Sequence, residues 1–170
     1  MNNTIILGFG NPDRGDDGAA WVALSSIACH FGYPIDSEQI ETGFISINDS
    51  LQLWLNLQLM PELAEDLARF DRAVFVDAHT EDIEEDVRVV EVQPHYQNSP
   101  FTHHLTPASC LSLCKELYSK CPRSILVSMR GYEFGFSRQL SPKTSENVNK
   151  AVQLILAWLE KDELPTSVLG

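Results

Sequence analysis

The start of the chain constrains the fold most strongly. Residues 4–7 are a short run of β-branched and aliphatic side chains that ends at Gly8. Such a run before a glycine turn is typical of a fully buried strand. After a polar loop, residues 19–31 carry apolar side chains at helical spacing, and Gly32 supplies a stop. The sequence therefore predicts a strand, a loop and a helix in succession.

Similar units follow along the chain. Thr106-Pro107 and Ser141-Pro142 each place an N-cap residue before a first-turn proline, which predicts two further helices. In residues 50–70 the apolar positions fit a helix better than a strand, and Pro61 divides that segment in two. The expected strands are residues 4–7, 39–42, 73–78, 87–93 and 124–129, with 87–93 as an edge strand.

This alternation of strands and helices predicts an α/β fold. We expect three αβα layers, with a twisted, mostly parallel sheet of about five strands between the helices. With 170 residues, 44% of them hydrophobic, the chain is expected to form a single domain over residues 1–170. Residues 161–170 are expected to be a loose tail.

The net charge and the cysteine pattern exclude several kinds of partner and a disulfide-rich fold. Acidic residues number 24 and basic residues 12, so the formal charge is −12 and phosphate backbones and anionic lipid should repel the chain. We expect no nucleic acid or membrane partner. Cys29, Cys110, Cys114 and Cys121 contain no CxxC pair and do not form a disulfide framework. The N-terminal apolar run is too short for a signal segment. These features favour a cytoplasmic protein, which we expect to be a monomer.

Polar side chains that could bind a metal or take part in catalysis gather where strands end. Asp16 and Asp17 lie in the loop after the first strand, and Asp77 ends the strand at 73–78. His103 and His104 come just before the helix that starts at Thr106. In an open α/β sheet, the carboxyl ends of the strands meet at the edge where ligands bind. We therefore expect these residues to lie along one edge.

Two carboxylates and an imidazole make an incomplete coordination shell. Asp17, Asp77 and His104 would suit nickel or zinc, with positions left for substrate or water. Alternatively, either aspartate of the loop is a helix N-cap. The glycine loop could also hold a nucleotide phosphate with magnesium on the acids, although Arg14 is the only basic residue there.

Other reactive residues have simpler interpretations. Cys110 and Cys114, four residues apart on one helix, are expected to pack in the core. His79 is close enough to Asp77 in the sequence to support it, and Glu133 could line the same cleft. His30 is interpreted as a residue that compensates a helix dipole, and His95 as a surface residue.

Three stretches carry a resemblance to a known family. LGFGNPDRGDDG at 7–18, FVDA at 75–78 and THHLTPASCLSL at 102–113 resemble the signature regions of the nickel-iron hydrogenase maturation endopeptidases, in the same order and spacing. The similarity covers about residues 3–160. QLMPELAEDL at 58–67 further resembles the branch that serves soluble, bidirectional hydrogenases.

The resemblance implies a peptidase, aspartic-type or metal-dependent, that removes a C-terminal extension from the hydrogenase large-subunit precursor after nickel insertion. The family's metal-binding residues fall on Asp17, Asp77 and His104, and the catalytic set on Asp17, Asp77 and Asp16. Asp16 would orient its neighbour or assist a proton transfer. The nickel belongs to the precursor, so the free enzyme would hold water or an adventitious divalent ion.

The chain departs from the family pattern at two places. Ala20 stands where the family often has glycine, and Thr42-Gly43-Phe44 stands where it often has a double glycine. The second departure bears on which precursor is recognised. A small-molecule or nucleotide-binding module and a non-catalytic precursor chaperone stay open as alternatives. The acidic run EDIEED at 81–86 is interpreted either as a solvated loop or as a region that steers the partner.

Overall fold

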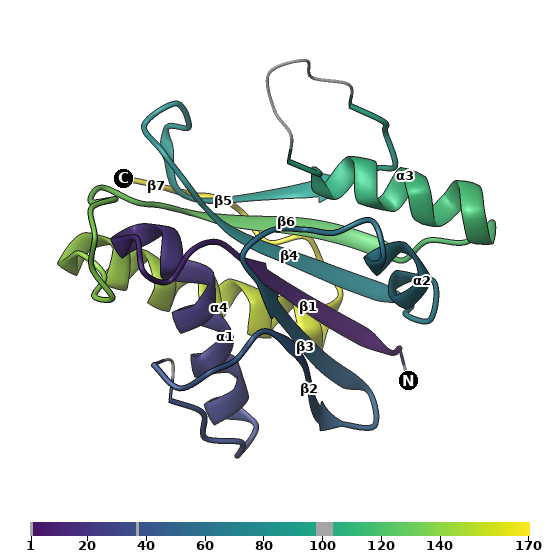
Figure 1. Cartoon of the computed structure of the whole chain (residues 1–170), viewed down its shortest axis with the longest axis horizontal. Helices are drawn as coiled ribbons and strands as arrows, with labels where there is room; N and C mark the ends of the chain where they lie inside the picture. The colour runs from purple at the N-terminus through teal and green to yellow at the C-terminus, as the bar shows by residue number, and fades with distance from the viewer. Residues whose placement is uncertain (1, 37, 98–103) are drawn as a thin grey trace.

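The protein is described here from a computed structural model, over residues 2–36, 38–97 and 104–170. A seven-stranded mixed sheet forms the middle layer of the described residues (Figure 1). Its order is β2-β3-β1-β4-β6-β5-β7, in which β3, β1, β4 and β6 run parallel and the other three strands pair antiparallel. The strands are β1 Thr4–Phe9, β2 Gly43–Asn48, β3 Leu51–Asn56, β4 Arg72–His79, β5 Glu85–Val92, β6 Arg123–Arg130 and β7 Val168–Leu169.

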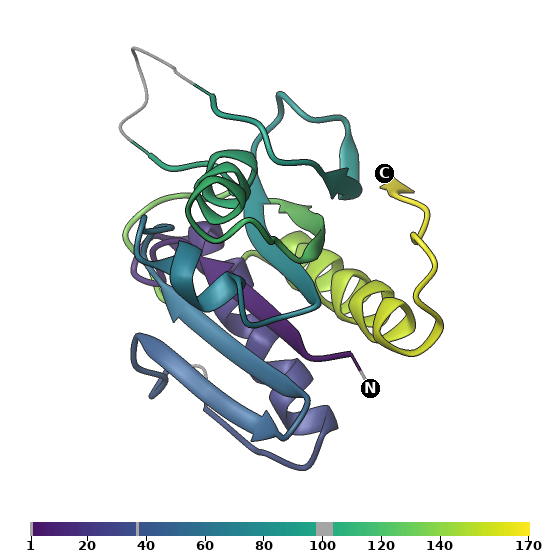
Figure 2. The same cartoon turned by 90° about the vertical axis from the view of Figure 1, so that its right-hand side faces the viewer.

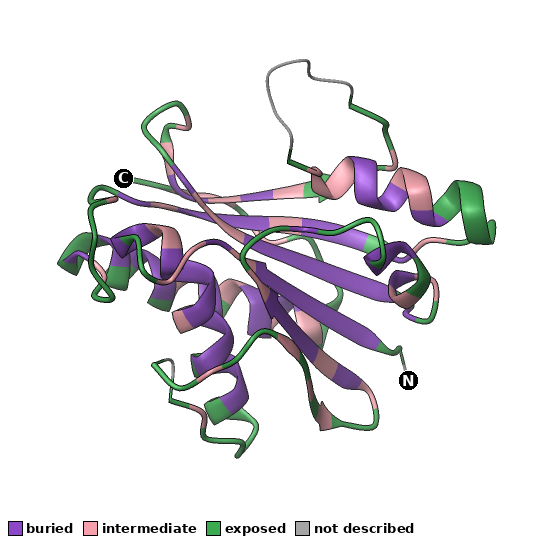
Figure 3. Ribbon diagram, in the orientation of Figure 1, coloured by how far each residue is buried: buried purple, intermediate pink, exposed green. Residues whose placement is uncertain are grey.

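Helices cover both faces of the sheet, which confirms the three-layer α/β prediction. They are α1 Ala19–His30, α2 Leu63–Leu67, α3 Pro107–Tyr118 and α4 Pro142–Lys161, with a 3-10 turn over Gly15–Gly18. One apolar cluster joins α1 and α4 to the sheet, and a second joins α2 and α3 to its other face (Figure 2). The central strands are buried along most of their length (Figure 3). No helix in the described ranges is long and apolar enough to cross a membrane.

Local signals in the sequence set the ends of the three long helices. Thr106 and Ser141 both accept a hydrogen bond from the backbone three residues on, as N-caps do. The chain leaves α1 through Gly32, whose φ of +78° suits a residue without a Cβ. The predicted helix boundaries are confirmed at these points.

Residues 51–56 form strand β3, so the helix predicted over 50–60 is wrong. Leu51, Leu53 and Leu55 are buried on one face, with a period of two rather than 3.6. Trp54 packs on the opposite face of the sheet. The leucines at every second position carry the period of a strand, but Leu51, Trp54, Leu55 and Leu59 also fit helical spacing, so the pattern is compatible with either structure. After Pro61, only the short helix α2 forms.

The strand predicted at 39–42 is also misplaced, since β2 starts at Gly43. Gly43 has a φ of +123°, which turns the chain into the sheet edge. Ile45 and Ile47 then pack against the cluster beneath α1, while the residues between them face outward. β2 is therefore an edge strand with one apolar face.

The tail predicted as loose contains strand β7, which pairs antiparallel with β5. The Ser167 hydroxyl also accepts a 2.8 Å hydrogen bond from the Val89 backbone N–H. These contacts place β5 inside the sheet rather than at its edge. The acidic loop is shorter than predicted, because Glu85 and Asp86 belong to β5, where Asp86 is buried and paired with Lys150.

The chain order puts a topological switch between β1 and β4. After β1 the chain passes through α1 and β2 to β3, which neighbours β1 in the sheet. It then returns through α2 to β4, which neighbours β1 on the opposite side. The loops that leave β1 and β4 therefore diverge at their carboxyl ends. In open α/β sheets this divergence creates the crevice in which ligands bind.

Candidate functional site

The two predicted aspartates flank the switch between β1 and β4. Asp17 lies in the 3-10 turn after β1, and Asp77 lies near the carboxyl end of β4. The negative charge of Asp17 contributes to the raised pKa of Asp77, so the two carboxylates are electrostatic neighbours. The structure thus brings together two of the three residues that the sequence singled out.

The loop around Asp17 is tightly folded. One Asp17 carboxylate oxygen accepts a 2.8 Å hydrogen bond from the Asn11 backbone N–H, which closes the loop on itself. Gly10 has a φ of +138°, and a Cβ there would collide with the Asp17 carbonyl oxygen. The glycine loop therefore shapes the backbone that presents Asp17, which stays half-buried.

Asp77 is held in a setting that disfavours its ionised form. Burial, with a smaller contribution from the nearby Asp17 charge, raises its pKa to about 7 against the hydrogen bond from the Ala78 backbone N–H. That 2.8 Å bond from Ala78 is the one hydrogen bond recorded for its carboxylate within the described residues. A cation bound beside this carboxylate would restore the ionised form.

Asp16 has the opposite environment. It is fully buried, and its two oxygens accept hydrogen bonds of 2.7 to 2.8 Å from two backbone N–H groups of the 131–140 loop and from Ser141 and Thr144 at the start of α4. Burial alone would raise its pKa, but the backbone hydrogen bonds outweigh burial and the pKa lies below the ordinary value. Asp16 thus joins the Asp17 loop to the segment that follows β6.

His104 lies at the same edge of the sheet but not in a shared coordination shell. Its Nδ1 is 3.0 Å from the side-chain oxygen of Gln58, two residues after the carboxyl end of the neighbouring parallel strand β3. In the described part of the chain, no three His, Cys, Asp or Glu side chains are close enough together to hold a metal. The triad of Asp17, Asp77 and His104 stays a prediction, and His103 is outside the described residues.

His79 bonds to groups other than Asp77. Its Nδ1 is 2.8 Å from the Ser128 hydroxyl, and its Nε2 is 2.7 Å from the Glu85 carbonyl oxygen. A carbonyl only accepts, so Nε2 carries the proton and Nδ1 accepts from Ser128 in the neutral ring. Burial lowers the pKa of His79, against the hydrogen bond to Glu85, and favours that neutral ring.

The remaining candidates lie apart from the pair of aspartates. Cys110 and Cys114 are buried on the inner face of α3, as predicted, and burial raises their thiol pKa values to about 12 and about 11. Glu133 is exposed, and its backbone N–H and carbonyl both bond to Asp16. His30 is in the last turn of α1, and His95 is exposed, both as expected.

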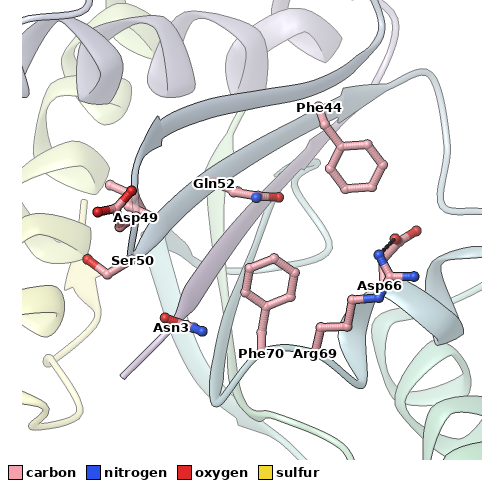
Figure 4. Close-up of a pocket in the computed structure, with 9 residues that line it drawn as sticks. Asn3, Phe44, Asp49, Ser50, Gln52, Asp66, Arg69 and Phe70 are labelled. Carbon is pink, nitrogen blue, oxygen red and sulfur yellow. Dashed lines mark ion pairs between the residues drawn. The ribbon is translucent and has the colours of Figure 1, made fainter. Parts of the chain in front are cut away.

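A separate cavity of about 290 Å³ opens between the face of β2 and β3 and the helix α2 (Figure 4). Its walls include Phe44, Gln52 and Phe70, and Arg69 beside it is paired with Glu65 and Asp66 of α2. Asn3, which precedes β1, also lines it, so this cavity reaches the edge of the sheet opposite Asp77. It does not belong to the candidate site.

Comparison with known proteins supports a common fold with one group of enzymes. The hydrogenase maturating endopeptidase HybD from E. coli superimposes with a TM-score of 0.71 at 18% identity, over 98% of this chain and 97% of that chain. The NiFe hydrogenase maturation protease HycI from Thermococcus kodakarensis gives 0.61 at 23% identity, over 94% of each chain. The chain shares their fold.

Sequence comparison alone finds no such relationship. No protein-family profile matches the chain, and no curated protein matches it. The hydrogenase 3 maturation protease, at 15% identity and a TM-score of 0.62 over 93% of this chain and 92% of that chain, is likewise similar in structure.

The sequence did not point to Gln58 and Ser128, because no local pattern marks a residue that contacts a distant histidine.

Proposed function

We propose that this protein is an endopeptidase that removes the C-terminal extension from a nickel-loaded NiFe hydrogenase large-subunit precursor. The observation that carries the proposal is the pair formed by Asp17 and Asp77 at the switch between β1 and β4. The fold shared with hydrogenase maturation proteases supports the same assignment. The role of those enzymes in hydrogenase maturation supplies the kind of substrate.

The precursor's nickel is substrate in this proposal. It would bind between the carboxylates of Asp17 and Asp77, whose mutual repulsion a divalent cation relieves. His104 would exchange its Gln58 partner for the ion, since both contacts use a ring nitrogen at the same edge of the sheet. Recognition would then require a precursor that already contains its metal.

The chemistry assigned to the chain is proton transfer at the scissile peptide. With the precursor's cation bound, Asp77 would be ionised, and an ionised carboxylate can accept the proton of an attacking water. The cation would polarise the scissile carbonyl. Asp16 is already occupied by hydrogen bonds, so we assign it the positioning of Asp17 rather than a proton transfer.

The test is incubation of the purified protein with nickel-loaded and nickel-free precursor, with the product mass measured by mass spectrometry. We expect a shortened product only from the nickel-loaded form, and loss of cleavage by at least about a hundredfold in Asp17→Asn, Asp77→Asn and His104→Ala. Asp66→Asn is the matched control, because burial also raises the pKa of Asp66 but it lies on α2, away from the pair.

Two other functions give different results in the same assay. A precursor chaperone would bind the nickel-loaded form and leave its mass unchanged. A nucleotide-binding module would bind a nucleotide with magnesium and ignore the precursor. Arg14 is the only basic residue in the loop after β1, which also carries Asp13, Asp16 and Asp17, so that loop offers little net positive charge to a phosphate.

A further inference from the structure

A polar corner adjoins the candidate site on the same face of the sheet. Phe75 and Leu126 pack under α2 and α3, so by strand alternation Asp77, Ser128 and Arg130 continue that face toward the carboxyl edge. Arg88 of β5 pairs in register with Ser128. Three adjacent strands thus present polar side chains beyond the end of the apolar cluster.

The middle of this corner is neutral and fixed. Ser128, His79 and the Glu85 carbonyl form a chain of hydrogen bonds of 2.8 and 2.7 Å that joins β6, β4 and β5. Ser128 and His79 are both buried. This series of hydrogen bonds contributes no positive charge, so the positive charge of the corner comes from the two arginines beside it.

Neither arginine is compensated by an acid. Within the described residues, Arg69, Arg72, Arg123 and Arg138 make ion pairs, whereas Arg14, Arg88 and Arg130 make none. Of these three, Arg14 is exposed, and only Arg88 and Arg130 are half-buried. The chain has twice as many acidic as basic residues, 24 to 12. In such a chain, an arginine that is half-buried and has no ion-pair partner is unusual.

Arg130 also has an unmet hydrogen-bonding need. Its Nε is buried and has no partner among the described residues, although a buried N–H normally finds one. Its guanidinium lies 5.1 Å from the centre of the Tyr132 ring, which restricts the plane of the group. A half-buried, oriented guanidinium with an unpaired Nε–H is prepared to receive an anion.

Both arginines lie beside the same imidazole. Arg130 pairs in register with His79, and Arg88 pairs with Ser128, whose hydroxyl is 2.8 Å from the His79 Nδ1. Asp77 and Glu85 are acids close to this corner, but within the described residues no ion pair joins either of them to an arginine. The two positive groups therefore converge on one place without an ion-pair partner.

We propose that Arg88 and Arg130 form a binding site for a carboxylate of the peptide that the protein cleaves. This inference rests on the proposed function for the identity of the peptide. The shared chemistry is a carboxylate, from either an acidic side chain or a free C-terminus. Planar guanidinium groups bind carboxylates through paired N–H donors, and Arg130 has such a donor free.

The position of the site indicates which part of the peptide it would contact. Asp77 pairs in register with Ser128, and Ser128 with Arg88, so the arginine lies two strands away from the catalytic aspartate. Two strand spacings are about 10 Å, which an extended peptide covers in about three residues. The carboxylate therefore belongs to a residue about three positions from the scissile bond.

The first test uses the free protein and needs no cleavage. The Nε–Hε signals of Arg88 and Arg130 are followed by NMR during titration with three synthetic tetra-alanine peptides: blocked at both ends, with a free C-terminal acid, or with glutamate as the last residue before a C-terminal amide. We expect both signals to shift with an acidic peptide and not with the blocked one. Whichever acidic peptide shifts them identifies the source of the carboxylate.

The second test separates this site from the proposed reaction. Arg88→Gln and Arg130→Gln should each raise KM for the nickel-loaded precursor about fivefold or more and leave kcat nearly unchanged. Arg123→Gln is the control, because Arg123 is paired with Asp162 at the opposite end of β6. The melting temperature is measured for all three.

The outcomes are distinct. If no acidic peptide shifts the arginine signals, the carboxylate site is wrong even where the precursor is cleaved. If the signals shift but the precursor is never shortened, the proposed peptidase function is wrong and the carboxylate site stands. Equal KM values for the parent protein and both arginine variants, with folding intact, would also overturn the proposal.

Discussion

Asp16 and Asp77 lie at the same edge of one sheet and have opposite electrostatic settings. Asp16 accepts hydrogen bonds from the 131–140 loop and α4, and its pKa lies below the ordinary value because these bonds outweigh burial. Asp77 accepts one bond from Ala78, and burial raises its pKa to about 7. A saturated carboxylate holds structure together, whereas an undersaturated one is available for a ligand.

The comparison also separates two neighbours in the sequence. Asp16 and Asp17 are adjacent, yet the first is fully buried and the second is half-buried beside Asp77. Residue type and sequence position therefore do not distinguish a structural acid from a functional one. The number of hydrogen-bond donors that reach each carboxylate oxygen distinguishes them.

The largest effect is expected from Asp16→Asn. The amide replaces an oxygen that accepts several bonds with an NH₂ group that only donates, which leaves buried donors facing one another. We expect a loss of about 3 kcal/mol or more in the free energy of unfolding, measured by urea denaturation at pH 7.

The exposed Asp49→Asn serves as the control and should change stability little. The Asp16 contribution should also depend on pH. Because its folded pKa lies below the ordinary value of 3.8, its stabilisation is present above that value and is lost as the pH falls through the folded pKa. Equal stability of both variants would contradict a structural role for Asp16.

An effect of opposite sign is expected from Asp77→Asn. The carboxyl ionises near 3.8 when unfolded and near 7 when folded, so the native state binds more protons between these values and loses stability as the pH rises through them. Removing the charge should raise stability at pH 8 by a few kcal/mol, at about 1.4 kcal/mol per pKa unit.

At pH 3.5 the Asp77→Asn variant and the parent should have nearly the same stability, because the Asp77 carboxyl is then mostly protonated in both the folded and the unfolded state of the parent. Thermal unfolding at the two pH values measures the difference. A variant that is less stable than the parent at pH 8 would show that Asp77 supports the fold, and the contrast with Asp16 would disappear.

The smallest effect on stability is expected in the loop between β4 and β5. Glu81, Asp82 and Glu84 are exposed, so neutralising all three should change the free energy of unfolding by no more than about 0.5 kcal/mol. If this loop steers the precursor, association of the neutralised variant, measured by stopped flow at low salt, should become slower, and the difference should vanish at high salt. Asp86 is excluded, because it is buried against Lys150.

Much of the fold was predictable because local signals marked it. The N-caps Thr106 and Ser141 and the stop at Gly32 fixed the ends of three helices. Strand β3 was not predictable in the same way, because its alternating leucines are accompanied by a second pattern, Leu51, Trp54, Leu55 and Leu59, that fits a helix. Strand β7 is two residues long, and only its pairing with the distant β5 defines it.

The candidate site was predictable in its outline and not in its bonding. The layout of an α/β sheet brings Asp17, Asp77 and His104 to one edge from positions far apart in the sequence. No spacing shows which partner each side chain takes: Gln58 contacts His104, and Ser141, which the sequence marks only as an N-cap, also bonds to Asp16. The separation of Asp16 from Asp17 therefore required the three-dimensional structure.

The hydrogen bonds of Asp16 have a consequence for synthesis of the chain on the ribosome. Asp16 is made early, but its partners Ser141 and Thr144 follow 125 and 128 residues later. The loop beside Asp17 therefore cannot take its final form until most of the polypeptide has emerged. A nascent or truncated chain would contain the aspartates of the site without their geometry, so the activity would arise only at the end of translation.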